Sequence, residues 1–264
     1  MLNINNVYKT FGKGTVNEKI VLEDFSLSVK DSDFITIIGG NGAGKSTLFN
    51  TIAGTFFVDK GKIVLDGKDI TFTPEYKRSR ELGRLFQDPL MGTAPDMTIE
   101  ENLALAYLRA GKGSGLATVK QKDREYFAQK LKGLGLGLET RLSSPVGLLS
   151  GGQRQALTLL MATLVTPKLL LLDEHTAALD PATVDKVMKL TCDIIAENHI
   201  TCMMITHNIK AALEVGTRTI MMDNGHIVLD IEGEERRGMT VPHLLQKFEQ
   251  NAKKALDNDR MLLS

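Results

Sequence analysis

The sequence predicts an α/β fold: a parallel sheet with helices, together with an antiparallel β subdomain and an inserted α-helical subdomain. A short strand rich in β-branched residues at Phe34–Ile38 runs into a glycine loop and then a helix. A fully apolar strand at Leu169–Leu172 ends in two acidic residues. Apolar runs of this length indicate strands that are buried on both faces, as in parallel sheets. Between them, helix-forming segments fill residues 89–164.

Composition excludes several classes of protein. Lys plus Arg and Asp plus Glu both number 32, so the chain has no basic field to attract nucleic acid, and we expect no nucleic-acid partner. Cys192 and Cys202 fit neither a redox pair nor a zinc pair, which favours a reduced, cytosolic protein. The first residues lack the pattern of a signal peptide, and no run approaches the roughly 18 to 20 apolar residues of a membrane span.

The N-terminal part predicts short strands that form an antiparallel patch. These strands are expected at Leu2–Val7, Ile20–Val29 and Ile63–Leu65, and Asp66-Gly67 after the third is a turn signal. Tyr8 directly follows the first strand.

The most informative stretch fits the P-loop pattern G-x-x-x-x-G-K-[ST]. It consists of Gly39, Gly40, Asn41, Gly42, Ala43, Gly44, Lys45, Ser46 and Thr47. The motif lies between a strand and a helix that ends before Gly54, so backbone N–H groups and a helix N-terminus would point at one anion. Lys45 would contact the β- and γ-phosphates, and the Ser46 hydroxyl would bind Mg²⁺. The stretch therefore predicts a nucleotide site.

The middle of the chain predicts helices separated by one strand. Thr73 and Pro74 are expected to begin a helix that runs to Leu82, and the strand after it leads to Gln87. A capping box beginning at Thr98 opens a second helix. After the glycine-rich break at residues 111–115, a third helix is expected over Val119–Leu131.

A second glycine-rich turn, Leu149–Gln153, precedes an apolar helix and includes Ser150 as a candidate cap. Such a turn binds an anion in some proteins, and in many others it has only a structural role. The pattern alone leaves both interpretations open.

Acidic side chains follow the apolar strand at Leu169–Leu172. Asp173 fits a Mg²⁺ ligand, and Glu174 fits a general base that accepts a proton from a water aimed at the γ-phosphate. Helix capping or a surface pair is the alternative. Asp180 and Pro181 then predict the start of a further helix.

The strand at Ile200–Thr206 ends at His207, a residue that on its own is more often structural than catalytic. We expect the P-loop, Gln87, the two acids and His207 to meet at one edge of the parallel sheet, where an α/β fold places its chemistry.

Taken together, these motifs resemble the nucleotide-binding subunit of an ABC transporter. The resemblance rests on Gly39–Thr47, Gln87, Leu149–Gln153, Leu169–Glu174, Ala178-Leu179-Asp180 and His207, which stand in the family's order and spacing. It covers nearly the whole chain and implies a RecA-like P-loop NTPase core. It also makes the Leu-Ser-Gly-Gly-Gln turn a functional motif. Ala177 stands where many members have serine.

The resemblance implies domain boundaries for a single ABC ATPase. The nucleotide-binding core with its β subdomain would be residues 1–88 and 165–240, the helical subdomain residues 89–164, and a C-terminal helix residues 241–264. It also implies a head-to-tail homodimer, or a paired ATPase subunit, with each ATP between the P-loop of one chain and the turn of the other.

The resemblance also assigns roles to individual residues. Ser150, Gly151, Gly152 and Gln153 would contact the ATP held by the other chain, and Asp180 would cross the interface. Gln87 would sense the γ-phosphate and Mg²⁺, and His207 would contact the γ-phosphate. Tyr8 would stack on adenine, with core packing as the alternative.

The function implied is an ATPase on the cytoplasmic face of the membrane that drives transmembrane permease subunits. Residues 173–181 and 221–225 resemble importer ATPases associated with tryptophan- or tyrosine-type binding proteins, which implies an extracytoplasmic binding protein as a partner. The ATPase of an export system, or of a lipid or lipoprotein extraction system, is the alternative. A soluble ABC protein that acts on ribosomes or DNA fits less well, because no tandem domain or charged linker is visible.

Overall fold

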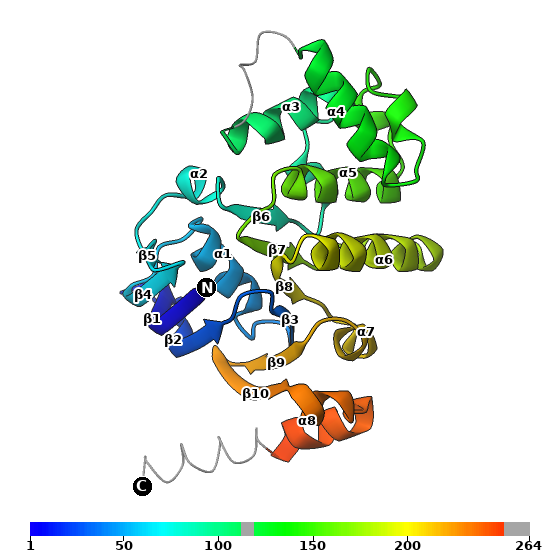
Figure 1. The fold of residues 1–264 in the computed structure, drawn as a ribbon. Helices are drawn as coiled ribbons and strands as arrows, with labels where there is room; N and C mark the ends of the chain where they lie inside the picture. Colours follow the sequence, from blue (N-terminus) through cyan, green and yellow to red (C-terminus); the bar gives the residue numbers. More distant parts are fainter. Residues whose placement is uncertain (112–118, 251–264) are drawn as a thin grey trace, which may run out of the picture. The chain divides into compact units, whose positions relative to one another are not determined.

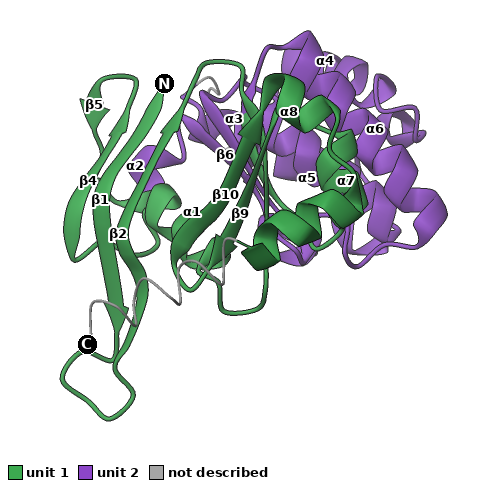
Figure 2. Ribbon diagram, turned by 90° about the horizontal axis from the view of Figure 1, so that it is seen from below, with its two compact units in different colours: residues 1–75, 202–264 green, residues 76–201 purple. Residues whose placement is uncertain are grey.

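The computed structural model describes residues 1–111 and 119–250. The chain divides into two compact units, which Figure 2 colours separately. The first contains residues 1–75 together with the described residues from 202 onward, and the second contains residues 76–201. The helical subdomain predicted at residues 89–164 lies inside the second unit. The subdomain boundaries themselves stay a prediction.

An antiparallel sheet in the first unit has the strand order β2-β1-β4-β5 (Figure 1). Its strands are β1 (Leu2–Phe11), β2 (Lys19–Val29), β4 (Lys60–Leu65) and β5 (Lys68–Asp69). Buried and exposed residues alternate at the start of β1, as expected where one face packs on a core. The prediction that β1 ends before Tyr8 is wrong, because β1 continues to pair with β2 as far as Phe11 and Tyr8 itself pairs with Lys60.

The second sheet of this unit carries the glycine loop. In the order β10-β9-β3-β8, its strands are β10 (His226–Glu232), β9 (Arg218–Asp223), β3 (Phe34–Gly39) and β8 (Thr201–Ile205). β3 pairs in parallel with both β8 and β9, and its first five residues are buried. Asn224 and Gly225 have φ values of 44° and 80°, which is the geometry of a two-residue hairpin turn between β9 and β10.

The first unit also contains the helices α1 (Lys45–Ala53), α7 (Ile209–Glu214) and α8 (Gly233–Arg237). Residues 241–250 are also helical, and Leu244 there is buried against Ile38 and Met221. The helix predicted over residues 241–264 is confirmed to residue 250, and its remainder lies outside the described residues.

The second unit combines a parallel strand pair with helices. Its elements are α2 (Glu75–Arg78, which starts at the unit boundary), β6 (Leu82–Leu85), η1 (Pro89–Gly92), α3 (Ile99–Arg109), α4 (Gln121–Lys132), η2 (Leu138–Thr140), η3 (Val146–Leu148), α5 (Gly151–Thr163), β7 (Leu169–Asp173) and α6 (Pro181–Glu197). Leu103, Phe127 and Leu157, from α3, α4 and α5, are fully buried in one apolar core. This core explains why these three helices pack together.

The helix predicted from Thr73 to Leu82 is mostly wrong. Only the single turn α2 forms, because β6 already begins at Leu82 and pairs in parallel with Leu169 of β7. The Glu81 carbonyl likewise accepts a hydrogen bond from the Lys168 amide at 2.8 Å. The capping box at Thr98 is confirmed by the contacts of its side chain with Glu101. Most of the predicted glycine-rich break at residues 111–115 lies outside the described residues.

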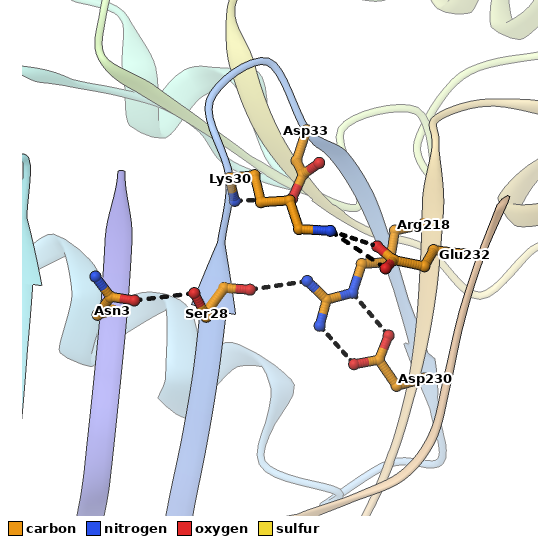
Figure 3. A network of polar contacts seen from close by, with 7 residues as sticks. All are labelled: Asn3, Ser28, Lys30, Asp33, Arg218, Asp230 and Glu232. Carbon is orange, nitrogen blue, oxygen red and sulfur yellow. Dashed lines mark hydrogen bonds and ion pairs between the residues drawn. The ribbon is translucent and has the colours of Figure 1, made fainter.

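A polar network ties the two sheets of the first unit together (Figure 3). The Arg218 guanidinium donates to both carboxylate oxygens of Asp230, at 2.7 and 2.5 Å, and to the Ser28 carbonyl at 2.8 Å. The Ser28 hydroxyl donates to Asn3 Oδ1 on β1 at 2.9 Å. The bond to Asp230 raises the pKa of Arg218. One largely buried arginine thus joins strands of both sheets.

Replacing Arg218 with methionine is expected to lower the free energy of unfolding by about 1 to 2 kcal/mol, because hydrogen bonds to charged groups are lost while Asp230 can rehydrate. Lys30→Met is the matched control, since the ion pair of Lys30 with Glu232 is 66% and 54% exposed. Its loss should cost less than about 0.5 kcal/mol. Denaturant titration of both variants measures the difference, and equal losses would contradict the special role of Arg218.

Candidate nucleotide-binding site

The glycine motif forms the predicted strand, loop and helix. β3 ends at Gly39, the loop follows, and α1 begins at Lys45 with Gly44 as its N-cap. Gly44 has a φ of 98°, and a Cβ there would lie 3.0 Å from the Val21 carbonyl oxygen, so the backbone requires glycine. The N-terminus of α1, with no acidic residue in its first turn, is suited to an anion.

Lys45 lies in the wall of this loop and is only 5% exposed. Its Nζ donates to the carbonyl oxygens of Gly39 and Gly40, at 2.8 and 2.9 Å. The ammonium is therefore already held against the loop that would surround the phosphates. Ser46 follows with an exposed side chain at the first turn of α1. Asn41 and Gly42 are exposed in the loop, Ala43 is buried and Thr47 is half-buried.

His207 lies at the same end of the first unit's parallel sheet as the loop. It follows β8, the neighbour of β3, and the Thr206 amide donates to the Ile37 carbonyl at 3.1 Å. The side chain is exposed, and Asn208 after it caps α7. The structure thus brings His207 and the P-loop strand together, as predicted.

Tyr8 lies in the first unit, inside β1, and its side chain is half-exposed. The Nζ of Lys60 lies 5.7 Å from its ring centroid. Partial desolvation, followed by the charge of Asp24, raises the pKa of its hydroxyl. Stacking of its ring on adenine stays a prediction.

In the second unit, two neighbouring parallel strands deliver the other predicted polar groups. Leu85, the last residue of β6, pairs with Leu172 of β7. Asp173 is the last residue of β7 and Gln87 follows β6, so both lie at the same end of this strand pair. Gln87 is exposed, whereas Asp173 and Glu174 are half-buried. These two strand ends are placed together as the sequence predicted.

Glu174 adopts an unusual backbone conformation, with a φ of 47°. A residue with a side chain in the left-handed region costs on the order of 1 to 3 kcal/mol, and such strain is concentrated at functional sites. The Glu174 carbonyl accepts a hydrogen bond from the Ala177 amide at 2.9 Å, which closes the turn after the strand. This turn holds Glu174 directly after the end of β7, and its role as general base stays a prediction.

His175 is a residue that the sequence analysis did not single out. Its side chain is 2% exposed, and its Nε2 lies 3.2 Å from the Thr191 hydroxyl of α6. Burial lowers its pKa to about 4, so the imidazole is neutral near pH 7. The sequence carries no signal for this contact: the spacing of Val187, Thr191 and Ile195 marks the buried face of α6, but not the residue that packs against it.

The second glycine turn caps α5. The Ser150 hydroxyl accepts from the Gln153 amide at 3.3 Å, and Gln153 Oε1 accepts from the Ser150 amide at 3.2 Å. A Cβ at Gly152 would lie 2.3 Å from Thr183 Cγ2, and one at Gly151 would lie 3.3 Å from Leu179 Cδ2. The two glycines therefore allow the turn to pack directly on α6 and on the segment before it.

Asp180 caps α6, as predicted. Its Oδ1 accepts from the Thr183 amide at 3.1 Å, and Pro181 occupies the first helical position. Hydrogen bonds from the side chain and the backbone of Thr183 lower the pKa of Asp180, so its exposed carboxylate is ionised near neutral pH.

The predicted site residues fall into two sets. Tyr8, the P-loop and His207 lie in the first unit; Gln87, Asp173, Glu174, the Ser150–Gln153 turn and Asp180 lie in the second. Each unit assembles its own set, and the meeting of both sets around one nucleotide stays a prediction. In the part of the chain that the structure describes, no helix has both the length and the apolar character needed to span a membrane.

Comparison with known proteins identifies the family. The model of the ABC transporter family matches residues 22–177. A tyrosine transport ATP-binding protein of Clostridioides difficile is 45% identical over 94% of this chain and 99% of its own length. A xylose/arabinose import ATP-binding protein of Sulfolobus acidocaldarius is 31% identical over 94% of each chain.

A solved structure supports the same assignment. It is a dimeric ATP-binding cassette in a post-hydrolysis state bound to ADP and phosphate, and it aligns with a TM-score of 0.75 and 28% identity. The alignment covers 90% of this chain and all of that one. That cassette is a dimer. The chain belongs to the ABC transporter family, as its ATP-binding and ATP-hydrolysing subunit.

Proposed function

We propose that this chain is the ATPase of a bacterial importer for tyrosine or a related aromatic amino acid. The observation that carries the proposal is the 45% identity to the tyrosine transport protein, which extends over nearly the full length of both chains. The identity to the sugar importer is 14 percentage points lower over the same share of this chain. The P-loop geometry described above supports ATP as the energy source.

In the proposed reaction, the P-loop holds the phosphates of ATP and Tyr8 stacks on the adenine. Lys45, already held beside the loop, donates to the β- and γ-phosphate oxygens. Glu174 accepts the proton of the attacking water, and His207 contacts the γ-phosphate. Gln87 senses whether that phosphate is present.

The donor set also fits Mg²⁺, which prefers oxygen ligands and retains phosphate and water in its shell. The exposed Ser46 hydroxyl at the start of α1, with Gln87 and the Asp173 carboxylate at strand ends, would supply these oxygens. The ion would neutralise charge on the phosphates.

We further propose a head-to-tail homodimer. The Ser150–Gln153 turn of one chain would face the ATP bound by the other, and Asp180 would cross the interface. Because the turn opens α5, its N–H groups and helix dipole favour a phosphate. ATP would then strengthen the dimer by mass action, and hydrolysis would weaken it.

The proposed partners are permease subunits and an extracytoplasmic substrate-binding protein. A subunit that consumes ATP and drives a permease would lie on the cytoplasmic face of the membrane. The substrate would be recognised by the permease and the binding protein, because this chain supplies the energy for transport.

Purification of the tagged full chain from detergent-solubilised membranes of the source cell tests the proposal. We expect a permease and a binding protein to co-purify, and the binding protein to bind tyrosine in a calorimetric titration, with leucine as the control. A permease with large extracytoplasmic domains would instead indicate export or lipoprotein extraction. Recovery with ribosomes, or without a membrane partner, would overturn the transport role.

A further inference from the structure

The segment that joins β7 to α6 carries the proposed general base at its start and the proposed interface residue at its end. Glu174 begins it in a left-handed conformation, and Asp180 ends it as the cap of α6. Between them, the Ala177 amide donates to the Glu174 carbonyl and the Leu179 amide donates to the Thr176 carbonyl, at 2.9 and 3.2 Å. These two turns shape the segment locally, but they do not attach it to the body of α6.

The side chain of His175 provides that attachment. Its Nε2 lies 3.2 Å from Thr191 Oγ1, more than two turns into α6. His175 is 2% exposed and Thr191 is 0% exposed, so water does not compete for this contact. A buried polar pair of this kind fixes its two elements at one spacing.

The direction of the hydrogen bond follows from the partners of Thr191. Its hydroxyl donates to the Val187 carbonyl, at 2.8 Å. A hydroxyl has a single hydrogen, so Thr191 accepts from His175. The imidazole therefore carries its proton on Nε2, and this proton is the one that holds the segment to the helix.

We propose that His175 is a positioning residue for ATP hydrolysis: its hydrogen bond to Thr191 holds the Glu174 carboxylate in the direction that the reaction needs. The inference rests on the proposed role of Glu174 as general base. A left-handed residue persists only where its surroundings determine it, and the side chain next in sequence is anchored in the core. Loss of the anchor would let Glu174 relax, and small displacements of a reacting group lower the rate strongly.

Two substitutions of His175 separate anchoring from simple space filling. In His175→Gln the amide nitrogen reaches the place of Nε2 and can still donate to Thr191. In His175→Asn the amide nitrogen reaches only the place of Nδ1. Thr191→Val removes the acceptor at nearly constant volume, and Thr191→Ser keeps it.

ATP turnover of the full chain is measured with Mg²⁺ over a range of ATP concentrations. We expect His175→Asn and Thr191→Val each to lower kcat on the order of 10-fold. KM for ATP should stay within about twofold, because ground-state binding is not touched. The double variant should be no slower than either single variant, since both remove one bond. His175→Gln and Thr191→Ser should stay within about threefold of the unchanged chain.

Full turnover in Thr191→Val would overturn the proposal, as would equal losses in His175→Gln and His175→Asn or additive losses in the double variant. Should Thr191→Val fail to fold, the comparison of the glutamine and asparagine variants decides the question. Glu174→Gln, assayed alongside, tests the general-base role of Glu174 separately from the positioning role of His175. If it keeps full turnover, the proposed base is wrong. If it is inactive while His175→Asn is fully active, only the positioning role fails.

Discussion

Replacing Glu174 with glutamine is expected to lower ATP turnover by about 100-fold or more, because a positioned general base contributes about 10²- to 10⁴-fold in rate. Glutamine has nearly the same shape, so the left-handed turn at this position should form as before. Its amide cannot accept the proton of the attacking water. ATP binding should persist, and since ATP is no longer consumed, the ATP-bound dimer should accumulate.

Phosphate release and size-exclusion chromatography with ATP and Mg²⁺ measure both effects. Glu197→Gln, which removes an exposed charge at the end of α6 in the same unit, is the matched control and should leave both quantities unchanged. An unaltered turnover rate in Glu174→Gln would remove the base assignment. A dimer that forms equally in the control would show that net charge, and not hydrolysis, governs association.

The features that the sequence predicted correctly are mostly local ones. Thr98, Ser150 and Asp180 each begin a helix as expected, because a cap and the amide it binds are only three residues apart. The P-loop is local as well, since its glycines, lysine and helix start follow one another without interruption. Runs of buried residues, such as Leu169–Leu172, identify the inner strands for the same reason.

The errors come from contacts between distant residues. The helix predicted from Thr73 to Leu82 does not form over its full length, because Leu82 begins strand β6. Leu82 pairs there with Leu169, which lies far along the chain. The partner of His175 likewise lies 16 residues away on another element, and a histidine after two acids has no periodic signal. The arrangement around one nucleotide was inferred from strand order, a property of topology that local patterns do not determine.

Replacing Lys45 with methionine is expected to weaken ATP binding by about 10- to 150-fold, the equivalent of about 1.5 to 3 kcal/mol for hydrogen bonds to a charged group. Methionine fills much of the same space in the wall of the loop, where Lys45 is 5% exposed. Lys19→Met is the matched control. Lys19 is exposed, and its Nζ lies 3.8 Å from where a Cβ of Gly42 would be. The substitution Lys19→Met therefore removes one positive charge beside the same loop, as Lys45→Met does.

Thermal unfolding with and without ATP distinguishes the two variants. At an ATP concentration of about 100 times the dissociation constant, the unchanged chain should gain about 2.7 kcal/mol of stability. A 100-fold loss of affinity would reduce this gain to about 0.4 kcal/mol. Lys19→Met should lose less than about threefold in affinity, because exposed charges contribute little. Equal losses of ATP affinity in the two variants would mean that the positive charge around the loop attracts ATP without a direct contact from Lys45. A loss confined to Lys45→Met means that the ammonium held at Gly39 and Gly40 binds the phosphates directly.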